Sequence, residues 1–241
     1  MKKSAFFALL LLAGCATPLP QAPPDGIPAS IPPPPVSVGD SWTYQWHDGY
    51  TQFSKGTYRY TVTAIAPQRM TVQVTRDGEP ASTQIFTRDW NWLEKPMTNL
   101  RNFRYSPPYP ALPFPLEAGK TWQAYITATD PATGQTNRVR IDGDVLGWER
   151  VKVPAGEFDA LKLRRLVYAG NADYDRGEEN ISEFDWYAPR IGQVIKQVSS
   201  SRYLDKRASC DFGYCDNWVR NDWNVIELVR FERGGASGNP Q

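Results

Sequence analysis

The apolar residues of this chain recur at every second position, and this alternation limits the fold more than any other feature. Trp42, Tyr44 and Trp46 fall on one side of an extended segment, and the polar residues between them fall on the other. No segment carries a sustained helical apolar stripe. The sequence therefore predicts a mostly β fold, an antiparallel curved sheet that forms an open barrel or a sandwich. Similar alternating runs follow at 57–65, 70–75, 83–87, 121–129, 137–145, 160–168, 181–187, 193–203 and 218–232.

Two strand starts in the chain resemble each other. Gly39-Asp40-Ser41-Trp42 and Gly119-Lys120-Thr121-Trp122 both place a glycine, a polar residue, a hydroxyl residue and a tryptophan in order. The similarity predicts two related β units, about 37–88 and 117–233, within one β domain over 37–233. Both tryptophans are then expected to point into the core. Chance similarity between two short strand starts is the alternative.

The two predicted units are joined by an aromatic segment, 89–117, that contains six prolines. Proline cannot donate a backbone hydrogen bond, so the segment is not expected to be regular sheet throughout. One interpretation is an ordered coil that caps an open end of the sheet, and the other is a loop that contacts a ligand. Under the second interpretation the candidate ligand-binding residues are Trp90, Trp92, Tyr105, Tyr109 and Phe114.

The N-terminus combines two lysines with the apolar run from Ala5 to Leu12, which is typical of an export signal. Leu12-Ala13-Gly14-Cys15 resembles the lipobox of bacterial lipoproteins. That resemblance implies a signal peptide at 1–14 and a Cys15 that carries a diacylglyceryl group and an N-acyl chain, which together anchor the protein stably to a membrane. The run is shorter than the about 20 residues of a transmembrane helix. An ordinary cleavable signal is the alternative, but it would not need the cysteine.

Prolines dominate the stretch that follows the cysteine, so residues 15–36 are predicted to be a lipidated, semi-extended tether. The residue after Cys15 is Ala16 and not the aspartate that resembles the inner-membrane retention signal of enteric bacteria. The resemblance to lipoproteins therefore implies an outer-membrane, periplasm-facing protein in a Gram-negative envelope. Residues 234–241 are predicted to be a flexible tail.

The charge balance excludes one class of partner. Lys2 and Lys3 belong to the predicted signal peptide, so the mature chain keeps 25 of the 27 basic residues beside 26 acidic ones. A nearly neutral chain has no electrostatic footprint for nucleic acid. The expected partners are the membrane, through the lipid, and an envelope protein or apolar ligand.

Two cysteines remain once Cys15 is assigned to lipid. Cys210 and Cys215 are separated by four residues, and an exported pair at that spacing predicts a disulfide that pins a hairpin tip. A redox pair is the alternative, although thioredoxin-like motifs have two intervening residues and lie beside a βαβ pattern.

Catalytic and metal sites find little support in the residues. His47 is the single histidine, which leaves no Ser-His-Asp or Cys-His set and too few ligands for zinc. The acid-rich segment 171–183 does not match a calcium loop, because its sixth residue is Arg176 and its twelfth is Ser182. A solvated hairpin tip is the simpler interpretation of that segment. We expect no cofactor and no metal.

A second resemblance lies in the C-terminal half. Val153-Pro154-Ala155-Gly156 with Phe158 and Leu161, followed by Trp186-Tyr187-Ala188-Pro189 and Gly192, resembles uncharacterised envelope β proteins of Gram-negative bacteria. The family is similar at fold level to periplasmic lipoprotein carriers, which hold acyl chains on a concave face. The resemblance covers roughly residues 116–200 and implies no catalytic residue.

These observations favour a non-catalytic binding or scaffold module for an apolar ligand or an envelope partner. The alternative is a carboxylate-based hydrolase that acts on envelope glycans and needs two acids brought together by folding. An apolar groove would favour a carrier, and a deep polar cleft with paired carboxylates would favour the enzyme.

Overall fold

The structure of the protein is a computed structural model that describes residues 22–97, 102–170, 176–206 and 217–235. Twelve β-strands make up its regular structure. They are β1 (Ser41–Asp48), β2 (Ser54–Ile65), β3 (Met70–Arg76), β4 (Ser82–Phe86), β5 (Trp92–Pro96), β6 (Asn102–Tyr109), β7 (Thr121–Thr129), β8 (Thr136–Val153), β9 (Gly156–Ala169), β10 (Arg176–Ala188), β11 (Gln193–Asp205) and β12 (Trp218–Glu232). Within these ranges there is no helix long and apolar enough to cross a membrane.

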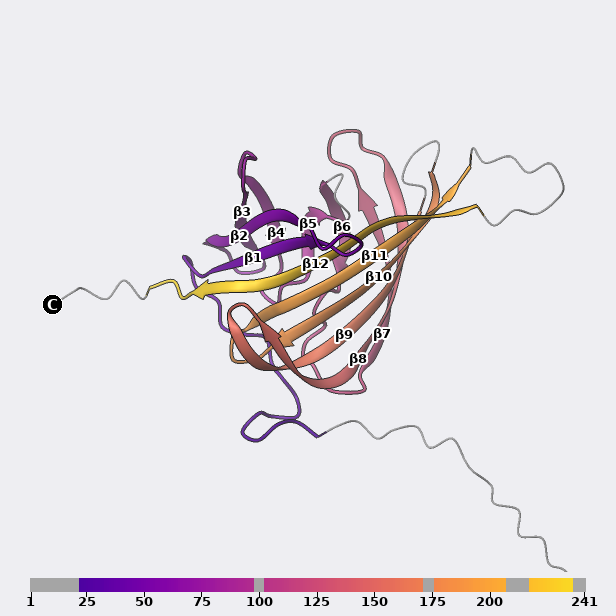
Figure 1. Ribbon diagram of the computed structural model, residues 1–241. Coiled ribbons are helices and arrows are strands. Elements are labelled where there is room, and N and C mark those ends of the chain that lie inside the picture. The colour runs from indigo at the N-terminus through magenta and orange to yellow at the C-terminus, as the bar shows by residue number, and fades with distance from the viewer. Residues whose placement is uncertain (1–21, 98–101, 171–175, 207–216, 236–241) are drawn as a thin grey trace, which may run out of the picture.

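The strands form one closed antiparallel barrel (Figure 1). Each strand pairs with its neighbours in the sequence, and β1 pairs with β12 to close the cylinder, from Ser41 beside Glu232 to Asp48 beside Asn224. The predicted mostly β, antiparallel fold is confirmed. The sheet closes completely, so no edge strand is left unpaired as it would be in an open barrel or a sandwich.

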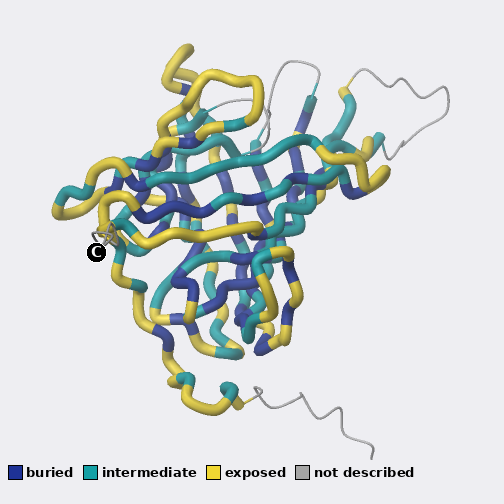
Figure 2. The backbone as a smooth tube through the Cα atoms, turned by 60° about the vertical axis from the view of Figure 1, so that its left-hand side comes forward, coloured by how far each residue is buried: buried dark blue, intermediate teal, exposed yellow. Residues whose placement is uncertain are grey.

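Alternation along the strands separates the core from the surface. Trp42, Tyr44 and Trp46 are buried inside the barrel, as their spacing predicts. The outer face carries ion pairs between neighbouring strands, such as Arg164 with Asp144 and Lys196 with Glu227. Buried positions consequently recur along each strand in Figure 2, between half-buried and exposed ones.

The two similar strand starts have the same backbone geometry. Gly39 and Gly119 both have a positive φ, 91° and 84°, which glycine adopts without a steric penalty. Gly39 N donates to the carbonyl of Val62, and Gly119 N donates to the carbonyl of Val145. Trp42 lies in the core with 1% of its surface exposed. The starts of β1 and β7 therefore share one backbone geometry.

Trp122 departs from this equivalence in its burial. It packs against the core but stays half-buried, because it lies across Gly143, its partner on β8. A Cβ atom on that glycine would come within 2.2 Å of the indole ring. The second tryptophan thus sits on the inner side near the end of the barrel, and only the first is fully enclosed.

The aromatic segment 89–117 is more regular than its prolines suggest. It contains β5 and β6, and β6 includes Pro107 and Pro108, with a cis peptide bond between Ser106 and Pro107. Its coil portion begins after Tyr109 and turns into the barrel, where Ala111, Leu112 and Leu116 are buried. The predicted coil between two units is thus two strands of the barrel followed by a short plug.

The plug closes one end of the barrel, which we call the closed end. Leu116 pairs with Ile31 of the N-terminal segment through two backbone hydrogen bonds of 2.9 Å. The β8–β9 hairpin, made by the Val153-to-Gly156 turn that the sequence indicates, reaches across to β12, where Ala155 N donates to the carbonyl of Leu228. The opposite, open end carries the β1–β2, β3–β4 and β7–β8 connections. Residues 22–36 leave from the closed end (Figure 1, indigo).

Candidate ligand-binding site

The interior of the barrel holds a cavity of about 230 Å³ at the open end, which we call the outer chamber. Its wall combines aromatic rings with amide, hydroxyl and charged groups. Tyr60, Trp92 and Lys95 contribute from one side, and Gln197, Ser199 and Ser201 contribute from β11. Gln84 and Ser201 are buried, and Gln84 Oε1 and Ser201 Oγ have no hydrogen-bond partner among the described residues. The chamber is therefore able to hold a ligand that forms hydrogen bonds.

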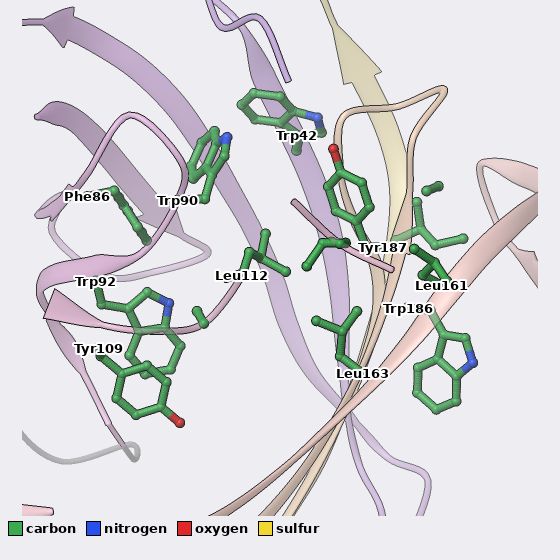
Figure 3. Close-up of a cluster of buried hydrophobic side chains, with 14 of the residues drawn as sticks. Trp42, Phe86, Trp90, Trp92, Tyr109, Leu112, Leu161, Leu163, Trp186 and Tyr187 are labelled. Atoms are coloured by element: carbon green, nitrogen blue, oxygen red, sulfur yellow. The ribbon is translucent and has the colours of Figure 1, made fainter. Parts of the chain in front are cut away.

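A second cavity of about 100 Å³ lies deeper, toward the closed end, and is called the inner chamber. Its wall is mainly apolar, with Trp42, Phe86, Trp90 and Leu112 among the lining residues. Figure 3 shows Leu112 of the plug between Trp90 and Trp92 on one side and Leu163 and Tyr187 on the other. Five residues line both chambers, so the two spaces adjoin: Tyr60, Trp92, Lys95, Gln197 and Ile226.

A buried ionic cluster lies against both chambers. Arg165 is fully buried on the inner face of β9, and its Nε donates to Glu183 Oε2 over 2.8 Å while Nη2 donates to Asp185 Oδ2 over 2.6 Å. Its third nitrogen, Nη1, donates to the carbonyl of Ala111 in the plug. Tyr109 donates to Glu183 and Gln197 donates to Asp185, so three of the four carboxylate oxygens accept a protein hydrogen bond.

The opposite charges of the cluster stabilise one another, although one guanidinium facing two carboxylates leaves a net negative charge. Burial opposes the charge of Arg165, but Asp185 and Glu183 outweigh that effect and hold the pKa of the guanidinium well above its usual value. Burial and the adjacent Glu183 raise the pKa of Tyr109, so this phenol stays protonated and remains a donor. The Arg165 cluster thus ties β9, β10 and the plug together inside the barrel.

Lys95 is the charged side chain that reaches the boundary between the chambers. Its ammonium lies 4.4 Å from the centre of the Trp92 ring, and it forms no ion pair with any residue in the described ranges. Burial lowers the pKa of Lys95, and the nearby Glu183 and Asp185 oppose that shift only in part. The surroundings of Lys95 therefore disfavour the charged form of its ammonium group.

Three of the five aromatic residues proposed from the sequence as ligand-binding residues contact one another, and a fourth, Trp90, packs in a neighbouring aromatic group. Trp92 stacks on Tyr109 at 4.1 Å, Tyr105 meets both rings, and Trp90 packs between Phe86 and Trp42. Trp90 and Trp92 line the chambers. The fifth residue, Phe114, lies apart and packs edge-on against Tyr187. Tyr105 and Tyr109 are core residues. Trp90 and Trp92 are therefore the two that remain candidates for contact with a ligand.

Sequence reasoning missed the charged residues of the site. Glu179 and Glu183 were expected on a solvated hairpin tip, but both are buried, because β10 begins at Arg176 and turns its odd-numbered side chains inward. Arg165 likewise falls on the same face as Leu163 and Val167. Opposite charges at inward positions of two adjacent runs were the available signal. No signal of this kind existed for Lys95. An irregularity in the pairing of β5 with β6, between Trp92 and Glu94, shifts the alternation of inward and outward side chains there.

The two carboxylates do not form the acid pair that the hydrolase alternative needs. A general acid has to hold a proton and meet its substrate, whereas Glu183 and Asp185 both accept hydrogen bonds from Arg165. Among the residues that the structure describes, no three histidine, cysteine or acidic side chains are grouped for metal binding. His47 lies near the end of β1, half-buried.

Other predicted sites fall outside the described residues. Cys15, the proposed lipid attachment site, lies in the segment 1–21, and Cys210 and Cys215 lie in the segment 207–216. The first five residues of the acid-rich segment, 171–175, are also outside. The lipid anchor and the disulfide therefore stay predictions from the sequence.

Comparisons with known proteins give structural likenesses only. No family model matches the chain, and no curated protein matches it. A candidate lipoprotein from Parabacteroides distasonis has 13% identity and a TM-score of 0.47, with 84% of this chain and 99% of that chain covered. A candidate exported protein with a YmcC-like fold from Bacteroides fragilis has 14% identity and a TM-score of 0.48, with 84% and 100% covered. The hypothetical lipoprotein YmcC from Escherichia coli has 12% identity and a TM-score of 0.42, with 81% and 88% covered.

Proposed function

We propose that this protein is a non-catalytic binding protein of the cell envelope, anchored to the outer membrane through lipid on Cys15, which holds a small ligand inside its barrel. The observation that carries the proposal is the outer chamber, a cavity of about 230 Å³ with unpartnered buried polar atoms of Gln84 and Ser201 in its wall. Buried polar groups normally have a partner, and a bound ligand would supply one.

The position of the tether agrees with this role. Residues 22–36 leave from the closed end, where Ile31 pairs with Leu116, whereas the outer chamber lies at the open end. A lipid attached beyond this tether would leave the mouth of the chamber on the side away from the membrane. Replacing Cys15 with serine should then release the protein from membranes and abolish labelling with palmitate, as fractionation would detect.

The sizes of the chambers favour a small ligand over acyl chains. A dry cavity of about 150 Å³ accommodates one benzene molecule. The outer and inner chambers are of this order, so neither has room for the several long chains of a lipoprotein. The wall of the outer chamber is also partly polar, unlike the apolar groove expected of a carrier of the kind that the fold-level analogy suggests.

A blocked variant tests the proposal. Ser199 faces the outer chamber from β11, opposite Glu183 in the register of β10 and β11, and Ser199→Trp should fill the space beside that carboxylate. The full chain with Cys15→Ser, with and without Ser199→Trp, would be dialysed against a small-molecule extract of bacterial envelopes and the retained compounds identified by mass spectrometry. We expect at least one compound that only the unblocked protein retains. Equal retention by both proteins, or retention by neither, would refute binding in the chamber, provided that circular dichroism shows both to be folded.

A further inference from the structure

The charged residues that line the two chambers are partnered, with one exception. Arg76 pairs with Glu79 at 2.6 Å, and Glu183 and Asp185 are bound by Arg165. Asp222, which lines the outer chamber, is also engaged in an interaction. Lys95 forms no hydrogen bond or ion pair within the described part of the chain, although the ring of Trp92 and the charges of Glu183 and Asp185 lie near it. The ammonium of Lys95 therefore keeps hydrogen-bond donors available for a ligand.

Hydrogen-bond donors without a partner also favour a ligand that carries acceptor atoms. Trp42 and Trp90 line the inner chamber, are buried, and have indole nitrogens without a protein acceptor. Ser201 adds a hydroxyl without a partner in the outer chamber. An indole N–H only donates, and an ammonium only donates, so these groups need acceptor atoms from a ligand. Carboxylate oxygens are the acceptors that bind an ammonium most strongly.

The aromatic faces argue against a neutral sugar as the ligand. Sugars bind on free aromatic faces, but the ring of Trp92 already stacks on Tyr109 and lies under Lys95. The ring of Trp46 lies under Lys55 and Arg76 at 4.9 and 4.6 Å. The outer chamber, with a volume of about 230 Å³, has room for a compact apolar group that is joined to an anionic one.

We propose that the ligand is a small organic anion with a compact apolar body, whose carboxylate binds Lys95 at the boundary of the chambers and whose body lies in the outer chamber. This inference rests on the proposed function. A charge-assisted hydrogen bond in a buried site is worth enough to make an anion bind about tenfold or more tightly than its neutral counterpart. The lowered pKa of Lys95 agrees with this arrangement, because a bound carboxylate would relieve the penalty on the buried ammonium.

Benzoate and benzyl alcohol make a matched pair of probes, since they share a ring and differ in charge. Calorimetric titration at neutral pH would measure both dissociation constants on the full chain with Cys15→Ser. We expect benzoate to bind about tenfold or more tightly than the alcohol. Lys95→Met should abolish that preference, and Lys95→Arg should restore it. Lys152→Met, at an exposed position on β8, is the control and should bind as the parent does.

The outcomes separate this inference from the proposed function. Equal binding of both probes, or a preference for benzoate that survives Lys95→Met, would overturn the assignment of Lys95 while leaving the chamber as a binding site. Failure of both probes to bind, together with no difference between the unblocked and Ser199→Trp proteins in dialysis, would overturn both proposals. Thermal unfolding of each variant establishes that a lost preference is not lost folding.

Discussion

At the scale of single residues, Arg165 determines how the barrel interior tolerates charge. A buried ion pair contributes little net stability, because desolvation offsets attraction, but removing one partner leaves an uncompensated charge that is costly. Here the guanidinium of Arg165 donates hydrogen bonds to two carboxylates and to one backbone carbonyl. The cluster therefore specifies which strands and which plug pack together, more than it adds to the free energy of unfolding.

Replacing this arginine should be among the most destabilising changes on β9. Arg165→Met leaves Glu183 and Asp185 buried without their cation, and we expect a loss of about 3–5 kcal/mol in the free energy of unfolding. Adding Glu183→Gln and Asp185→Asn should recover much of that loss. Arg164→Met is the matched control, because Arg164 pairs with Asp144 on the outer face, 43% exposed, where a pair is worth about 1 kcal/mol or less. Urea unfolding would measure all three, and equal losses for Arg164 and Arg165 would contradict the argument.

Asp48 gives a second residue-scale prediction, which concerns pH. The hydrogen bond from Lys55, at 2.9 Å, and those from the amides of Thr51 and Tyr50 lower the pKa of Asp48 to about 2 from 3.8. The unfolded chain binds the proton more readily, so this contribution is fully present above pH 3.8 and is lost as the pH falls toward 2. We expect Asp48→Asn to flatten the fall of thermal stability between pH 4 and about 2. An unchanged slope in that window would show that the turn does not control acid stability.

These residues also show where sequence reasoning stops. The alternation that places Trp42 and Tyr44 inside also places Arg165 and Glu183 inside, but an isolated strand does not reveal that the two are neighbours. They lie directly opposite each other in the register of β9 and β10, and that register is set by the whole barrel. For Arg165 or Glu183 taken alone, a charged side chain exposed to solvent was the better expectation.

At the scale of elements, the runs with clean alternation were predicted well and the interrupted ones were not. Most strands, and the Val153-to-Gly156 turn, follow from local pattern and turn chemistry. β5 and β6 were missed because prolines lie in β6 and because the pairing of β5 is irregular beside Trp92. Closure between β1 and β12 joins residues nearly 190 positions apart, which no local pattern encodes.

The β7–β8 pair supports a prediction about packing between strands. Trp122 lies across Gly143, and a Cβ at that position would meet the indole ring at 2.2 Å. Gly143→Ala should therefore displace the ring and cost about 1–3 kcal/mol, as overpacking does. In a Trp122→Ala background the same change should cost little. A double-mutant cycle by urea unfolding measures this coupling, and additive effects would show that the glycine is needed for another reason.

At the scale of the whole molecule, both ends of the folded chain lie at the closed end. Gly234 N donates to Asp40 Oδ1 over 2.7 Å, so the end of β12 lies beside the start of β1. The plug and the β8–β9 hairpin occupy the same end. The mouth of the outer chamber is thereby kept clear of residues 22–36, and the twelve strands form one continuous wall.

This arrangement predicts that the barrel tolerates new chain ends. A permutant would join Gln241 to Ala22 through about ten glycine and serine residues, a length that spans roughly 17 Å, and would open the chain between Thr133 and Gly134. Both residues are exposed in the β7–β8 turn, so no buried contact is cut. The entropy of loop closure grows only slowly with loop length, and the permutant keeps every strand pair, so we expect its unfolding midpoint to lie within a few degrees of that of the linear chain 22–241. Calorimetry would compare the two, and loss of a cooperative transition would show that the β7–β8 connection, and not the closed sheet, holds the barrel together.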